Sequence, residues 1–268
     1  MKNIIPMPLA TIPSLETLFK SNEDIFNKIN IASDLYSMQS VKHEHYLDKL
    51  TSEIRVGYTR DSGLLQRLEC RLSEYFRQTA QPLSLSVKRT SEEAVCLGKI
   101  SGIHCEYETP LPIKALISEI STDLGGGGFR DGAIYSAPDR AGYRIVYPAH
   151  RLVENRLNEI ERIFSDADGK YHQVAAIVGI VLFFNAHPLR DGNGRVGRVL
   201  YNMKARRSPR HQAAYLPLYE FIRLSAGGFN YATRMAWINN EWRPVLHWFL
   251  SAHIIAYRLC KRLSIHET

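Results

Sequence analysis

The sequence has little of what marks several protein classes. Its 268 residues include only 4 cysteines, 17 glycines and 12 prolines, and no two cysteines form a CxxC pair. These numbers exclude a disulfide scaffold and a collagen-like or low-complexity chain, so we expect free thiols. The longest apolar run, residues 174–184, is shorter than the roughly 18 residues that a bilayer span needs.

Two further absences bear on location and chemistry. The N-terminal residues show no recognisable secretory signal, because prolines interrupt the short apolar stretch. We therefore expect a cytoplasmic protein that does not enter membranes, with export by a specialised route left open. The histidines outside residues 187–198 show no spacing typical of metal ligands.

Positive charge is concentrated in one stretch. The chain has a formal net charge of +7, whereas residues 1–60 carry as many acidic as basic side chains. Residues 190–211 hold seven cationic side chains and one acidic one. Such a patch attracts phosphate, although a solvated basic face would also explain it. The last cations of this stretch form a basic cluster, Lys204, Arg206, Arg207 and Arg210. We expect this cluster to be a solvated helix end, with contact to nucleic acid or to an acidic protein partner as the alternative.

Apolar residues recur at helical spacing along most of the chain. An extended arm is predicted over 1–13, and β-like runs at 133–135 and 143–147 predict one hairpin. Residues 79–112 give no clear pattern. We expect an all-α, mostly helical fold with a small β-hairpin flap, divided into an N-terminal helical extension, 1–105, and a second domain, 106–268. The predicted helices cover 14–56, 63–78, 112–122, 149–166, 170–186, 195–207, 216–225, 229–239 and 242–264.

The stretch from His187 to Arg198, HPLRDGNGRVGR, has the properties of an anion site. Gly192 and Gly194 allow a sharp turn at the expected start of the next helix, where unpaired N–H groups favour phosphate. Arg195 lies three residues before Arg198, so the two guanidiniums share a helical face and can pair with phosphate groups.

Two side chains of this stretch add chemistry to anion binding. Asp191 supplies a hard oxygen ligand beside the expected phosphates, as a magnesium ion requires. The imidazole of His187 can accept a proton at neutral pH. These features together indicate phosphate chemistry by positioning and charge neutralisation, without choosing the group that is transferred.

This stretch resembles the signature HPFx(D/E)GNGRxxR of Fic (Fido) proteins. Leu189 stands where the family usually has Phe, an exchange of one apolar residue for another. Residues 127–130, Gly-Gly-Phe-Arg, are similar to the GxFR segment before the family's flap. The resemblance implies a Fic catalytic domain and a nucleotidyltransferase that moves AMP from ATP to a Ser, Thr or Tyr hydroxyl of a protein, releasing pyrophosphate.

The resemblance also implies a role for individual residues. His187 would be the general base, and Asp191 would hold Mg²⁺ or Mn²⁺ at the phosphates. Tyr231 would contact the adenine. The remaining phosphate-binding residues would be Gly192, Asn193 and Gly194 as the anion hole, Arg195 at the β-phosphate and Arg198 at the γ-phosphate.

A target protein would dock at the flap near 133–147 by main-chain pairing. The resemblance leaves room for an antitoxin or other regulatory partner and for a homo-oligomer, and nucleic acid is not expected. The alternatives within the family are transfer of UMP, GMP or phosphocholine, and removal of AMP. The alternative outside enzymes is a basic module that binds nucleic acid or protein.

Many family members carry an inhibitory helix with the pattern Ser/Thr-x-x-x-Glu-Gly/Asn, whose glutamate pairs with the second arginine of the motif. Residues 49–57 are the expected place for it, but Arg55 or Val56 occupies the glutamate position. The full pattern occurs nowhere in the chain. We therefore expect that inhibition by a glutamate of this chain is lost or degenerate.

Overall fold

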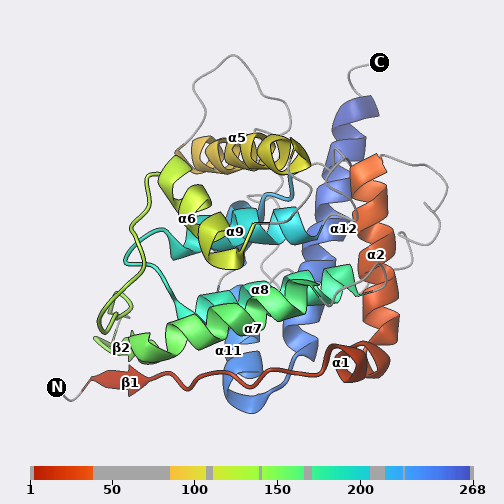
Figure 1. Cartoon of the computed structure of the whole chain (residues 1–268). Coiled ribbons are helices and arrows are strands. Elements are labelled where there is room, and N and C mark those ends of the chain that lie inside the picture. Colours follow the sequence, from red (N-terminus) through yellow and green to blue (C-terminus); the bar gives the residue numbers. More distant parts are fainter. Residues whose placement is uncertain are drawn as a thin grey trace.

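A computed structural model describes residues 3–38, 85–106, 111–138, 141–165, 171–205, 215–225 and 227–265. Helices make up most of this part of the chain (Figure 1). The elements in order are β1 (Ile4–Pro6), α1 (Leu15–Ser21), α2 (Glu23–Met38), α5 (Leu85–Glu106), α6 (Ile113–Asp123), β2 (Arg144–Val146), the 3₁₀ helix η1 (His150–Leu152), α7 (Val153–Ser165), α8 (His172–Ala186), α9 (Asn193–Lys204), α10 (Leu218–Leu224), α11 (Gly228–Asn239) and α12 (Arg243–Ile265).

Helix α8 forms the centre of the core. All of its residues except Phe184 are buried, as a helix that is apolar on every face requires. Helices α7 and α9 pack along it, and α1, α2 and α11 also contact it. This packing fixes the C-terminal end of α8, where His187 follows.

Segments from the two ends of the chain lie side by side. Helix α2 packs against α12, and in Figure 1 the two run next to each other. Helix α5 contacts both α9 and α10, so a segment from the N-terminal half of the chain lies against the helix that contains the second half of the motif.

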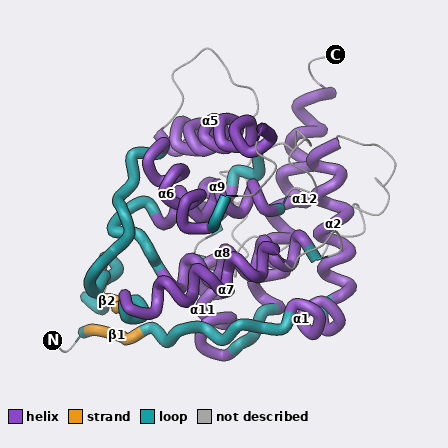
Figure 2. Tube along the Cα trace, viewed as in Figure 1, coloured by secondary structure: helices purple, strands orange, loops and turns teal. Residues whose placement is uncertain are grey.

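The small sheet differs from the predicted hairpin. Strand β1 pairs with β2 in parallel, with Ile5 opposite Ile145, and Figure 2 shows both strands at one end of the fold. The hairpin is reduced to one antiparallel bridge, between Tyr135 and Val146. The extended arm predicted over 1–13 thus supplies the second strand, because its backbone groups can pair with the edge of β2.

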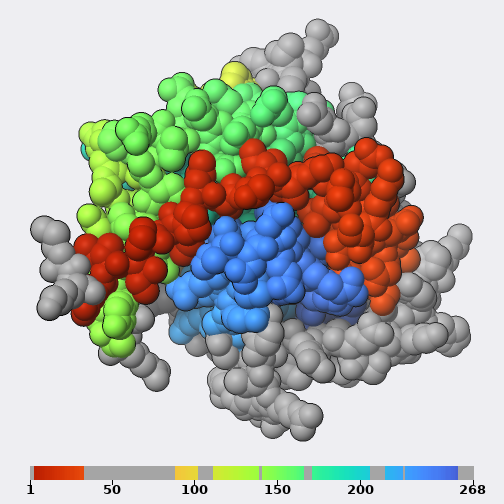
Figure 3. Space-filling view, turned by 90° about the horizontal axis from the view of Figure 1, so that it is seen from below, coloured from red at the N-terminus to blue at the C-terminus, as the bar shows by residue number. Residues whose placement is uncertain are grey.

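The arm is fixed by two buried side chains behind β1. The amide of Asn185 donates to the carbonyl of Pro8 (3.0 Å) and accepts from the N–H of Ala10 (2.9 Å). The guanidinium of Arg156 donates to the carbonyl of Ala10 (2.6 Å). Figure 3 shows the arm running across the surface between the middle and the C-terminal parts of the chain. It is therefore part of the packed domain.

The prediction of a mostly helical fold is confirmed, and the helices predicted from residue 112 onward all exist. Helix α5 lies in a region where no clear pattern was found in the sequence. The predicted helix 63–78 and the part of 14–56 beyond residue 38 lie outside the described residues. None of the described helices combines the length and the apolar composition of a membrane-spanning segment.

Candidate functional site

The loop between α8 and α9 places the motif. His187 ends α8 with a left-handed backbone (φ 49°), and Gly192 precedes α9 with φ 87°. Leu189 is fully buried, as its role as an apolar anchor requires. The side chain of Asn193 accepts from the N–H of Leu189 (2.9 Å) and donates to its carbonyl (2.8 Å). The amide of Asn193 therefore closes the loop, and only its backbone remains for an anion.

The glycine run before the flap lies directly on this loop. The N–H of Gly127 donates to the carbonyl of Asp191 (3.1 Å), and the N–H of Arg190 donates to Gly128 (2.9 Å). A Cβ added at Gly127 would come within 2.8 Å of the backbone nitrogen of Asp191. A glycine is therefore required at position 127 by the close approach of the two backbones.

Arg130 joins the base of the flap to the end of α8. Its buried guanidinium donates to the carbonyls of Gly132, Pro148, Ala186 and His187. Burial lowers the pKa of this arginine from its ordinary value. The sequence marked Arg130 only as part of a GxFR resemblance and did not indicate this role.

His187 is held in a neutral environment. Its ring stacks on that of Tyr147, with centroids 3.8 Å apart and planes 17° apart. Burial lowers the pKa of His187 to about 4, and the nearby charge of Arg130 also lowers it. The imidazole is therefore uncharged at neutral pH and can accept a proton.

Asp191 and Arg195 pair with each other at the start of α9. Their closest oxygen and nitrogen are 3.1 Å apart, and the Asp191 side chain is 78% exposed. Arg195 also donates to the carbonyl of Leu124. The described residues contain no group of three or more His, Cys, Asp or Glu side chains that could hold a metal. A metal at Asp191 would thus depend on phosphate oxygens and water, as Mg²⁺ commonly does.

Arg198 bears on our expectation about inhibition. Its Nε donates to Glu93 Oε2 (3.0 Å), and its Nη2 pairs with Glu93 Oε1. Burial alone would lower the pKa of Arg198, but the ion pair with Glu93 raises it. We expected inhibition by a glutamate of this chain to be lost or degenerate, yet a glutamate does pair with the second motif arginine, and it comes from α5 rather than from residues 49–57.

The sequence signal for Glu93 was incomplete. Four residues before it stands Arg89 where the pattern has Ser or Thr, and Ala94 follows where it has Gly or Asn. A search for a glutamate on a helix facing α9, without the flanking residues, could have found it.

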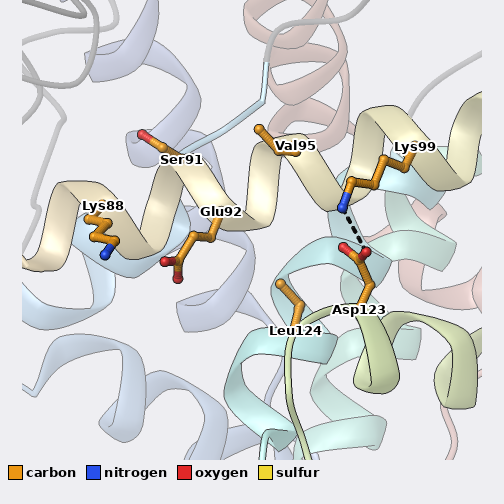
Figure 4. A pocket seen from close by; sticks show the side chains of 7 residues that line it. All are labelled: Lys88, Ser91, Glu92, Val95, Lys99, Asp123 and Leu124. Atoms are coloured by element: carbon orange, nitrogen blue, oxygen red, sulfur yellow. Dashed lines mark hydrogen bonds and ion pairs between the residues drawn. The ribbon is translucent and has the colours of Figure 1, made fainter.

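Two cavities open near the motif. One, of about 510 Å³, lies between α5 and the end of α6; Figure 4 shows Lys88 and Glu92 on α5 and Leu124 opposite them. Its other lining residues are Ser91, Val95, Lys99 and Asp123. Leu124 gives its carbonyl to Arg195, so this cavity adjoins the start of α9.

The second cavity, of about 400 Å³, is a groove between the flap and α11. Tyr147, which stacks on His187, is one of its walls. Ile5 and Met7 of the arm contribute to it, as do Arg234 and Trp237 of α11. The other lining residues are Ser136, Ala137, Tyr143, Ile145, Asn230, Thr233 and Ile238.

Tyr231 and Lys204 both lie outside the cavities described above. Tyr231 is on α11, next to the lining residue Asn230, but its side chain is half-exposed and does not line the groove. Lys204 packs its ammonium over the ring of Phe164 at 5.2 Å, and burial lowers its pKa. Lys204 thus lies in the last turn of α9 as expected, half-buried and packed on an aromatic ring. The other cations of that cluster lie outside the described residues.

Comparison with known proteins fits this geometry. Residues 109–204 match the sequence model of the Fic/DOC family. This segment contains the flap, α8 and the motif. No curated protein matches the chain.

Two solved structures share the fold. One is a Fic family protein from Desulfovibrio desulfuricans G20, with 17% identity, a TM-score of 0.57, and coverage of 97% of this chain and 78% of that one. The other is a fragment of Fic-1 from C. elegans, with 12% identity, a TM-score of 0.53, and coverage of 94% and 76%. The described part of the chain therefore has a Fic-like fold.

Proposed function

We propose that this chain is a Fic-type nucleotidyltransferase that transfers AMP from ATP to a Ser, Thr or Tyr hydroxyl of a target protein. The observation that carries the proposal is the placement of His187, whose ring stacks on Tyr147 and whose backbone carbonyl accepts from Arg130. It stands just before the start of α9, the helix that carries both motif arginines. A base beside a phosphate-binding helix terminus is what this transfer requires.

The transfer uses these groups in turn. His187 accepts the proton of the hydroxyl, whose oxygen attacks the α-phosphorus of ATP, and the bond from that phosphorus to the bridging oxygen of pyrophosphate breaks. The N–H groups of residues 192–194 and the guanidinium of Arg195 stabilise the charge that moves to the leaving pyrophosphate. Asp191 would hold Mg²⁺ or Mn²⁺, which neutralises phosphate charge when bound.

The groove between the flap and α11 is the proposed place for the nucleoside. It is lined by aromatic rings, Tyr143, Tyr147 and Trp237, and adenine stacks favourably on such rings. Tyr231 stays a proposed adenine contact, reached by turning its exposed side chain toward the groove.

The target segment is proposed to pair with the flap near 133–147. Strand β2 already has β1 on one side and the bridge to Tyr135 on the other. An arriving segment would therefore add outside one of these or take the place of β1.

We further propose that the conformation in which Glu93 pairs with Arg198 is inhibited. Glu93 occupies the guanidinium of Arg198, the group proposed to bind the γ-phosphate of ATP. A phosphate and a carboxylate compete for the same donors, so ATP can bind productively only when Glu93 leaves.

Glu93 also favours a second candidate function, the removal of AMP from a modified protein. That activity generally depends on the inhibitory glutamate in proteins that the motif resembles, and this chain has one in place. Incubation of an AMP-modified target with wild type and with Glu93→Ala distinguishes the two functions: only a hydrolase releases AMP, and only with Glu93 present.

The primary test uses ATP labelled at the α-phosphate together with a cell lysate. We expect labelled protein bands with Glu93→Ala that are absent with the double variant Glu93→Ala/His187→Ala. Parallel reactions with labelled UTP, GTP and CDP-choline identify the donor. Labelling that persists without His187 would contradict the general-base assignment.

Three further expectations remain proposals. They are the division into an N-terminal extension, 1–105, and a catalytic domain, 106–268, a regulatory partner such as an antitoxin, and a homo-oligomer. Helix α5 ends at Glu106, near the proposed boundary.

A further inference from the structure

We propose that Tyr215 is a positioning residue for inhibition: its hydroxyl holds Glu93 on Arg198 and so sets how strongly nucleotide is excluded. This inference rests on the proposed function. Tyr215 lies outside the motif and outside α5, just before α10, and nothing in the sequence pattern singles it out.

The contacts of the Glu93 carboxylate carry the inference. Tyr215 donates its hydroxyl proton to Oε2 at 2.7 Å, the same oxygen that accepts from Arg198 Nε at 3.0 Å. Oε1 accepts from the other side of the guanidinium. Glu93 is 0% exposed, and Arg198 and Tyr215 are each 6% exposed. The carboxylate is thus held by three protein donors away from solvent.

A second tyrosine of the same segment, Tyr219, contacts Arg198, the other member of the ion pair. The ring of Tyr219 lies 4.9 Å from the guanidinium of Arg198 and 5.1 Å from that of Arg89. Its hydroxyl accepts from Arg89 Nη1 at 3.2 Å. Arg89 is one turn before Glu93 in α5. Residues 215–219 therefore contact both members of the ion pair and the helix that carries the glutamate.

The direction of the effect follows from burial. When a terminal phosphate takes the guanidinium of Arg198, Glu93 loses its charged donors, and one phenol cannot sustain a buried carboxylate. Glu93 must then move out, and the bond to Tyr215 breaks with it. Because the bond exists only while Glu93 occupies Arg198, the hydroxyl of Tyr215 stabilises the inhibited state.

The test measures binding of a non-hydrolysable ATP analogue with Mg²⁺ by titration calorimetry. A buried hydrogen bond to a charged group is worth at least about a factor of ten in an equilibrium. We expect Tyr215→Phe to bind the analogue about tenfold more tightly than wild type. Glu93→Ala should bind it more tightly still, and Tyr215→Phe should add nothing in the Glu93→Ala background.

Two variants control for unrelated effects. Glu92→Ala removes the neighbouring, exposed glutamate of α5. Tyr201→Phe removes another buried phenol hydroxyl, which contacts His253 at 2.9 Å. Both should bind the analogue as wild type does, and thermal unfolding of each variant reports folding.

The outcomes separate the two proposals. If Glu93→Ala tightens binding and Tyr215→Phe does not, the role of Tyr215 is wrong and the inhibition by Glu93 stands. If neither variant tightens binding, both proposals fail. If Tyr215→Phe tightens binding equally with and without Glu93, Tyr215 acts on the nucleotide site by another route and the inference is overturned.

Discussion

The motif has two ends that are closed in different ways. At the phosphate end (Arg195, Arg198 and Glu93), a buried ion pair occupies the arginine proposed for the γ-phosphate. At the flap end (β1, β2 and Tyr147), the backbone of the arm occupies one side of β2, and all three residues of β1 are exposed. The phosphate end is thus closed by the buried carboxylate of Glu93, and the flap end by several exposed backbone hydrogen bonds between β1 and β2.

The two ends should therefore differ in how they respond to a single substitution. Removing one partner of a buried ion pair leaves an uncompensated charge, at a cost of several kcal/mol. Losing one exposed ladder bond costs much less, because water replaces it. The phosphate end should therefore respond sharply to a single substitution, and the flap end only to the loss of a whole segment or of its buried anchor.

The largest effect is expected where the two ends meet, at His187. In the Glu93→Ala background, His187→Ala should lower the transfer rate by about 10²–10⁴-fold, the usual contribution of a general base. Binding of the ATP analogue should stay within about threefold, because the imidazole is not among the phosphate donors. Radiolabel transfer and calorimetry measure the two quantities. A parallel loss of both would indicate a structural role.

The next largest effect tests the phosphate end alone. Glu93→Ala should raise the rate of labelling by on the order of 100-fold, because the free guanidinium of Arg198 then binds phosphate. Glu92→Ala, one residue away and exposed, serves as the matched control and should label as wild type does. Equal rates for all three proteins would contradict inhibition.

At the flap end, the sensitive position is the anchor of the arm. Asn185→Ala leaves the N–H of Ala10 and the carbonyl of Pro8 without their buried partner. We expect the free energy of unfolding to fall by about 1–3 kcal/mol. Urea denaturation measures this change. Asn239→Ala, at an exposed position on α11, should leave the midpoint unchanged.

Acidity should weaken the fold through two buried histidines. Burial lowers the pKa of His187 to about 4 and that of His253 to about 3, whereas in the unfolded chain both are near 6.5. Below pH 6.5 the unfolded chain therefore binds protons that the folded chain does not. The free energy of unfolding should fall as the pH is lowered from 6.5 toward 4 and stay unaffected by these groups above 7.

Urea midpoints at pH 7.5, 6.0 and 5.0 check this direction. A midpoint that rises on acidification would contradict the burial of neutral imidazoles.

The smallest effect is expected for β1 itself. Deletion of residues 2–6 keeps Met7 and the anchored residues 8–10, so the free energy of unfolding should fall by less than about 1 kcal/mol. If the target takes the place of β1, labelling of target proteins by the Glu93→Ala variant should rise on deletion. Unchanged labelling would favour pairing at the outer side of the flap.

The same contrast explains what the sequence could predict. The motif and the helices from residue 112 onward were readable because apolar periodicity and short-range spacing determine them. Glu93 was not, because its meaning comes from a contact with Arg198 more than one hundred positions away. The parallel pairing of Ile5 with Ile145 was missed for the same reason. The three exposed residues of β1 form no sequence pattern from which a distant pairing partner could be predicted.

Arg130 has a consequence for selectivity. Its guanidinium joins four carbonyls from the flap base and the end of α8, so the flap and His187 keep one fixed spacing. When a target segment pairs with the flap through its backbone, its register decides which of its residues lies at His187. A shift of the register by one residue places the next residue there. Under the proposed function, the modified hydroxyl is chosen by its register along an extended segment more than by the identity of its neighbours.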